Sequence, residues 1–343
     1  MVWGIFLKNI LRTAFLYTGT LIGAGFASGS EITVYFMKNI RCLIVLFFIS
    51  SAVFGIYGKL VMDTAIKSRV YNYEDLIKNA VGKKCAPIIN FITGLFFMVL
   101  FSAMISAFGT IFYNIFRINK NIGGCIFLFI CIPVIFGKTE GLVKANCILV
   151  PILIAGILFC SVYVCVEKNI SIGTYSCIPR SVDVWCGMKF IFYNMVSCVP
   201  ILIQHSEEGG EKSSYGCIIS ALILFLIGLS MSFAIDLCSA QKNVMPMIFI
   251  TKNISKVMYI IYMVSFVASV YTTAAGNGYC AAEWFMGKEK NKFLFILFIF
   301  LAYIMSFLNF YIFVENLYSI FSLIGMVELL AVIFYRVRVE IKG

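Results

Sequence analysis

The groups best placed to bind a charged ligand lie in the stretch TGTLIGAGFASGSEI, which ends in the carboxylate Glu31 and the apolar Ile32. Four glycines fall within eleven residues of it: Gly19, Gly23, Gly25 and Gly29. Glycine in a helix interior costs up to about 1 kcal/mol relative to alanine, so the stretch predicts an interrupted helix. An interruption leaves unpaired N–H groups on one half and unpaired carbonyls on the other. Those backbone groups can bind an anion and a cation.

A second stretch, FIFYNMVSCVPILIQHSEE, brings polar side chains to the level of a proline. Pro200 removes a backbone donor and crowds the carbonyl of Val196, which predicts a second interruption, with Asn194, Ser197 and Cys198 around it. Each stretch also has a plainer interpretation. The glycine spacing suits close packing of two helices, and a lone proline often makes only a kink.

The two breaks together predict a binding site for a zwitterion such as an amino acid. The half-helices that start near Phe26 and Pro200 present positive ends that favour a carboxylate. The carbonyl ends, at 19–22 and 193–195, favour a cation. The predicted site consists of the backbone at the first break with three side chains opposite: Gly23, Ala24, Gly25, Phe26, Asn194, Ser197 and Cys198.

Ionisable residues inside apolar spans are functional candidates. Glu328, in GMVELLAVIF, is predicted either to couple transport to protons or to pair with Arg336 or Arg338. Glu31 and Asp236 are expected near the outer ends of their helices, with their carboxylates reaching the headgroups.

Other polar residues carry weaker expectations. Ser102 and Ser106 share one helix face and are interpreted as packing residues, whereas Asn277 either faces a cavity or caps a helix end. His205 is the only histidine, and only Ser206 is adjacent to it as a nucleophile. No enzymatic activity is expected.

The composition places the chain in a lipid bilayer. Of its 343 residues, 62% are apolar and 13% are charged, and the mean hydropathy is +0.98. Soluble domains are about half apolar and about a quarter charged. The net charge of +11 is spread between apolar spans, which argues against nucleic-acid binding. Most of the 13 cysteines lie in apolar runs and neither pair as CxxC nor predict a metal site.

Windows of about 20 apolar residues predict an all-α integral membrane protein, a single transmembrane domain over 1–343. Ten spans are predicted at about 11–37, 42–62, 87–116, 122–137, 142–166, 187–206, 214–239, 255–280, 292–311 and 314–335. The lysines and arginines favour cytoplasmic N- and C-termini. Breaks at matching positions of spans one and six indicate two inverted five-helix halves, about 11–166 and 187–335.

The motifs GTLIGAGFASGSEI and TTAAGN resemble those of the YkvI-like bacterial membrane proteins. That uncharacterised family is similar to the amino acid–polyamine–organocation transporters with the LeuT-type fold. The resemblance covers nearly the whole chain by span count and order. It implies a five-plus-five inverted repeat with a central site between helices one, three, six and eight, and it implies no particular substrate.

The resemblance also implies a tentative Na⁺ site. In sodium-coupled transporters of this fold, the ion bridges carbonyls at the first-helix break and two hydroxyls of helix eight. Carried over by motif, the ligands are the carbonyls of Gly19, Ile22 and Ser269 and the hydroxyls of Thr272 and Thr273. These threonines could instead bond to the carbonyl one turn earlier in their own helix. No other cofactor is expected.

The function expected from these features is secondary transport of a small organic solute across the plasma membrane, an amino acid or an amine, coupled to Na⁺ or H⁺. The alternative is a sensor that keeps the transporter fold and binds a solute without moving it, similar to spore-germination receptor subunits. The sequence separates neither these two functions nor the oligomeric states.

Overall fold

The computed structural model describes residues 2–136, 139–168, 178–287 and 291–342, and all of its regular elements are helices. The first part of the chain forms α1 Val2–Leu21, α2 Ala24–Ala27, α3 Ser30–Tyr35, the 3₁₀ helix η1 Met37–Cys42, α4 Leu43–Ser68, α5 Tyr73–Val81, α6 Ala86–Phe116, α7 Lys120–Phe136 and α8 Thr139–Glu167. The second part forms α9 Ser181–Gly209, η3 Glu211–Tyr215, α10 Gly216–Leu237, α11 Pro246–Ile254, α12 Lys256–Met286, α13 Lys292–Met305, α14 Phe310–Ile312, the π-helical turn η4 Phe313–Leu317 and α15 Tyr318–Lys342.

Among the described residues, seven helical stretches are long and apolar enough to cross a membrane. They correspond to α4, α6, α8, α9, α10, α12 and the run from α14 to α15. Two further apolar helices, Lys120–Pro133 and Lys292–Met305, are shorter. Large apolar side chains such as Ile56, Phe129 and Phe300 are exposed on the outer faces of these helices, as a lipid environment requires.

The first predicted span is interrupted where the glycines indicated. α1 ends at Leu21, and α2 begins only at Ala24, after two residues outside any helix. A second turn separates α2 from α3 at Gly29, whose φ of +84° lies in the left-handed region that glycine adopts readily. Every residue of α2 is buried. Backbone that is not helical is tolerated at this depth only inside the protein or along a cavity.

The predicted interruption at Pro200 is wrong, because α9 runs without a break from Ser181 to Gly209. Side-chain donors bond to backbone carbonyls in the turns before the proline. Asn194 Nδ2 donates to Phe190 O at 3.0 Å, and Ser197 Oγ donates to Asn194 O at 2.8 Å. These two side chains therefore bond within a continuous helix rather than at a break.

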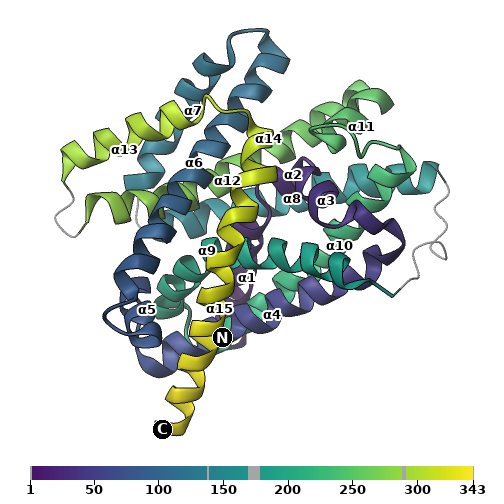
Figure 1. Ribbon diagram of the computed structural model, residues 1–343. Helices are drawn as coiled ribbons and strands as arrows, with labels where there is room; N and C mark the ends of the chain where they lie inside the picture. The colour runs from purple at the N-terminus through teal and green to yellow at the C-terminus, as the bar shows by residue number, and fades with distance from the viewer. Residues whose placement is uncertain (1, 137–138, 169–177, 288–290, 343) are drawn as a thin grey trace.

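The ends of several helices meet at the end of the molecule that holds both chain termini, in the lower part of Figure 1. Asn9 Nδ2, in α1, donates to Gly209 O at the end of α9 at 3.3 Å. Lys67, at the end of α4, lies 3.8 Å from Glu340, near the end of α15. α1 and α9 therefore run in opposite directions through the molecule.

Close approach of α15 to α9 depends on Gly325. A Cβ at this position would overlap the Phe192 carbonyl oxygen and lie 3.0 Å from Val196 Cγ2. Backbone cannot move aside as a flexible side chain does, so α15 lies directly against α9 only because residue 325 has no side chain.

We expect Gly325→Ala to destabilise the fold by about 1–3 kcal/mol through overpacking. The measurement is the melting temperature of the purified protein in detergent, followed by intrinsic fluorescence. Gly141→Ala is the matched control, because a Cβ at residue 141 meets nothing within 4 Å. The packing argument fails if the two variants melt at the same temperature.

Candidate solute and ion site at the first-helix break

The carbonyl side of the break is closed by hydroxyls from α12. Ser269 Oγ donates to Ile22 O at 2.8 Å, and Thr273 Oγ1 donates to Gly19 O at 3.5 Å. Thr272 Oγ1 donates to Ser269 O at 3.1 Å. The three carbonyls and two threonine hydroxyls expected to hold Na⁺ thus belong to one buried network.

The hydroxyl hydrogens, however, complete this network without an ion. Thr272 makes the bond to its own helix that was the alternative to ion binding. Ser269 contributes its side chain as well as its carbonyl. The carbonyls of Ile22 and Gly19 each keep a second lone pair for an ion while they accept these bonds. The oxygen-only donor set suits a hard cation such as Na⁺, and Na⁺ binding stays a prediction.

The N–H side of the break faces an aromatic wall rather than the polar side chains predicted on α9. The Phe26 ring lies 5.8 Å from that of Phe190, and Tyr35 lies 6.1 Å from Phe190 and 5.8 Å from Tyr193. Tyr318, in α15, lies 5.0 Å from Tyr193. The sequence analysis did not select these aromatic residues.

The predicted α9 residues are buried, and their polar groups contact other atoms of α9. Asn194 and Ser197 bond to carbonyls of their own helix, and Cys198 Sγ lies 3.8 Å from Ser197 Oγ. Phe190 and Tyr193 precede Asn194 and Ser197 by one turn. Residues three or four positions apart share a helix face. The spacing of Phe190 and Tyr193 from Asn194 and Ser197 was therefore the signal that could have identified the two aromatic residues.

Glu31 lies at the break itself, which corrects the expectation that its carboxylate reaches the headgroups. The residue is 4% exposed. Its carboxylate packs directly over the backbone of Gly25, so that a Cβ at residue 25 would overlap it. Gly25 therefore provides the space that Glu31 occupies. Asp236, by contrast, accepts a hydrogen bond from Gln241 Nε2 at 3.0 Å.

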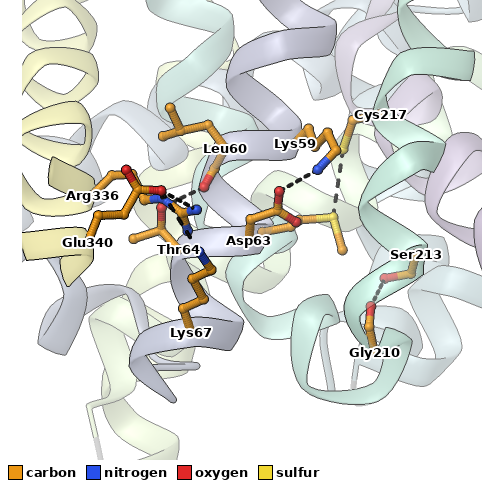
Figure 2. Close-up of polar contacts among 11 residues, drawn as sticks. Lys59, Leu60, Asp63, Thr64, Lys67, Gly210, Ser213, Cys217, Arg336 and Glu340 are labelled. Atoms are coloured by element: carbon orange, nitrogen blue, oxygen red, sulfur yellow. Dashed lines mark hydrogen bonds and ion pairs between the residues drawn. The ribbon is translucent and has the colours of Figure 1, made fainter. Parts of the chain in front are cut away.

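Glu328 is fully buried in α15, and neither of its oxygens has a hydrogen-bond partner among the described residues. The expected alternative, a pair with Arg336 or Arg338, is wrong, because no ion pair among the described residues includes Glu328. Arg336 instead bonds to Glu340 at 2.8 Å. Figure 2 shows Arg336 and Lys67 both directed toward Glu340.

Tyr73, in α5 outside the spanning helices, is an electrostatic neighbour of Glu328. Burial, together with the charge of Glu328, raises the pKa of Tyr73 well above its ordinary value. The phenol therefore stays protonated and able to donate. Its hydroxyl lies 3.1 Å from Thr93 Oγ1.

The remaining polar candidates have structural partners. Ser102 Oγ donates to Met98 O within α6, and Ser106 Oγ donates to Leu308 O in the segment after α13, each at 2.7 Å. His205 Nε2 lies 2.9 Å from Thr13 Oγ1. Asn277 is buried, and its Oδ1 has no hydrogen-bond partner among the described residues.

One side of the break is sealed by α11 and the segment before it. Met247 N donates to Ser28 O at 3.1 Å, and Ser30 Oγ donates to Val244 O. The Tyr262 hydroxyl, in α12, donates to Ala27 O. These bonds hold α2 and α3 against the far end of the molecule from the chain termini.

A cavity of about 230 Å³ lies toward the end that holds the chain termini, and its lining residues include none from α1, α2 or α3. Its lining comes from α5, α6, α9 and α12 and includes Tyr73, Asn90, Pro200, Gln204, Glu283 and Trp284. Gln204 Nε2 donates to Glu283 Oε2 at 3.1 Å across it. The molecule is thus hydrogen-bonded shut over the break at one end and hollowed at the end that holds the termini.

Comparison with known proteins finds an uncharacterised membrane protein by sequence and transporters of known structure by fold. No family model matches the chain. The uncharacterised membrane protein YkvI of Bacillus subtilis (strain 168) is 24% identical over 328 residues, which cover 92% of each chain. The resemblance to YkvI is therefore confirmed across nearly the full length.

Two solved structures show the fold. MhsT, solved in complex with L-phenylalanine, gives a TM-score of 0.68 at 14% identity and covers 92% of this chain and 87% of its own. The nucleobase-cation-symport-1 family transporter Mhp1, solved closed with bromovinylhydantoin, gives 0.61 at 14% identity and covers 93% and 71%. At such identity the likeness shows the LeuT-type fold alone.

We expect Tyr262→Phe to loosen the seal over the break. Loss of one hydrogen bond of about 1 kcal/mol raises the open fraction about five-fold. Hydrogen–deuterium exchange of peptides over residues 24–35 and 243–250 measures this opening. Tyr303→Phe removes a comparable bond to Asn121 O and should leave both peptides unchanged. Equal exchange in all three proteins would show that this bond does not hold the seal.

Proposed function

We propose that the protein is a secondary active transporter of a small organic solute, an amino acid or an amine, driven by a Na⁺ or H⁺ gradient across the plasma membrane. The observation that carries this proposal is the buried break between α1 and α2, where the carbonyls of Gly19 and Ile22 accept hydrogen bonds from α12 instead of from the next turn of their own helix. The shared fold also supports the proposal, because MhsT and Mhp1 were both solved with a small organic molecule bound.

The proposed architecture is one transmembrane domain of ten spans in two inverted halves, about 11–166 and 187–335, with both termini in the cytoplasm. The antiparallel course of α1 and α9 supports it, as does the meeting of helix ends near the two termini (Figure 1). The pattern of lysines and arginines favours the same orientation.

Movement of the solute follows from the two ends of the site. In the proposed cycle, the present structure is open toward the cytoplasm through the cavity beside Gln204 and Glu283. The bonds from Val244, Met247 and Tyr262 to α2 and α3 close the outer path. Breaking these outer bonds while filling the inner cavity exchanges the two states, so that the solute meets one side at a time.

Two groups are proposed as couplers, and either would tie solute movement to an ion gradient. Na⁺ held by the carbonyls of Gly19 and Ile22 and by α12 would pull α1 and α12 together. Its support is the existing network of those oxygens. A proton on Glu328 would instead neutralise a carboxylate that is costly to bury alone. Its support is the absence of a hydrogen-bond partner among the described residues.

The Na⁺ site predicts that sodium stabilises the protein at constant ionic strength, with K⁺ as the replacement ion. Thr272→Ala combined with Thr273→Ala should weaken the apparent Na⁺ affinity at least ten-fold, because two of five ligands are lost. Melting temperature against Na⁺ concentration gives the affinity. Thr110→Ala removes a threonine bonded within α6 and serves as the control. Solute uptake by the wild type that needs no sodium removes the Na⁺ proposal.

The proton alternative predicts that Glu328→Gln still binds solute but no longer accumulates it under an imposed pH gradient, because glutamine cannot carry the proton. Uptake of a radiolabelled panel of amino acids and amines into proteoliposomes is the measurement. Glu167→Gln, which changes an exposed carboxylate at the end of α8, is the control. Unchanged accumulation by Glu328→Gln assigns coupling elsewhere, and binding without accumulation by the wild type favours the sensor.

A further inference from the structure

The most unusual electrostatic feature of the break is that it contains a buried carboxyl group of the protein. Glu31 is 4% exposed, and its carboxyl group covers the backbone of Gly25. Among the described residues, the ion pairs join Lys59 to Asp63, Lys67 and Arg336 to Glu340, and Arg180 to Asp183. None of them includes Glu31, so no lysine or arginine balances its charge there.

The surroundings of Glu31 suit a cation. The rings of Tyr35, Phe190, Tyr193 and Tyr318 pack against one another beside this residue. Glu31 is an electrostatic neighbour of Tyr35, Tyr193 and Tyr318. Aromatic faces attract a desolvated ammonium, and the attraction can reach about 2 kcal/mol. Aromatic rings and a carboxylate together form a site for organic ammonium.

One polar group in the aromatic wall also lacks a partner. The hydroxyl of Tyr318 is buried and has no hydrogen-bond partner among the described residues, whereas the Tyr193 hydroxyl is an immediate neighbour of the Glu31 carboxylate. Buried polar groups are nearly always hydrogen-bonded, so an unpaired hydroxyl close to a carboxylate that forms no ion pair indicates that a ligand completes the set. Phenol oxygens can accept hydrogen bonds from an ammonium group.

We propose that Glu31, over Gly25, is the subsite that binds the ammonium group of the solute, and that the solute is an amine without a carboxylate. This inference rests on the proposed function and narrows its substrate class. A zwitterionic amino acid would bring its carboxylate to the break that Glu31 already occupies, and the two negative charges would repel each other. An amine supplies the charge that the site lacks.

Decarboxylated pairs test this directly with compounds that share one side chain. The wild type is titrated with 2-phenylethylamine and L-phenylalanine, with isoamylamine and L-leucine, and with 3-phenylpropionate as the anion. Melting temperature and calorimetry give the affinities at fixed Na⁺ and pH. We expect at least one amine to bind at least ten-fold more tightly than its parent amino acid, and the anion not to bind.

Variants then assign the preference to Glu31. Glu31→Gln should weaken amine binding at least ten-fold, and Glu31→Asp should retain part of the affinity. Gly25→Ala should also weaken it, because the new Cβ displaces the carboxylate. Glu315→Gln removes the same charge from an exposed position and should bind as the wild type does. Gel filtration and melting curves without ligand report whether each variant folds.

The outcomes separate this inference from the proposed function. If an amino acid binds more tightly than its amine, or if folded Glu31→Gln binds amines as the wild type does, the amine assignment is overturned while transport stands. If Glu31→Gln does not fold, the comparison of paired compounds on the wild type still decides the substrate class. If no labelled organic solute accumulates under any ion gradient, the transporter proposal itself fails.

Discussion

In a bilayer every backbone polar group must find a partner within the protein, and the break between α1 and α2 makes that requirement specific. The carbonyls of Gly19 and Ile22 accept from α12, and those of Ala27 and Ser28 accept from Tyr262 and the Met247 amide. The broken helix is thus bound to α12 on one side and to the α11 region on the other. A change in the hydrogen bonds to these carbonyls would therefore shift α11 and α12 relative to the break.

Buried charge imposes the second constraint. Glu340, near the end of α15, shows the ordinary arrangement, because its carboxylate pairs with Arg336 and Lys67 (Figure 2). Glu31 and Glu328 are different, because both are buried and neither forms an ion pair among the described residues. Glu31 adjoins the break, and Glu328 lies near Tyr73, which lines the cavity at the end that holds the termini. The two carboxyl groups are the ones proposed above to bind the solute and to exchange a proton.

Hydropathy and glycine content predicted the long spans and the first break, because both are local properties of the chain. The proximity of Ser269, Thr272 and Thr273 to the break came from the family resemblance. Pro200 misled because a membrane helix can accommodate a proline without a break, and because Asn194 and Ser197, which bond to carbonyls of their own helix, look like ligand groups in the sequence. The position of Glu31 could not be predicted, since it depends on the turn at Gly29, which directs α3 back over Gly25.

The central claim, that the solute binds at the break between α1 and α2, is tested most directly by an experimental structure of the protein in lipid nanodiscs. The sample should contain the tightest-binding amine of the paired compounds at saturation. The account predicts ligand density between Gly25, Glu31 and Tyr193, with the ammonium at hydrogen-bond distance from the Glu31 carboxylate. Ligand density elsewhere, or a helix that continues from α1 through Gly23, would contradict it.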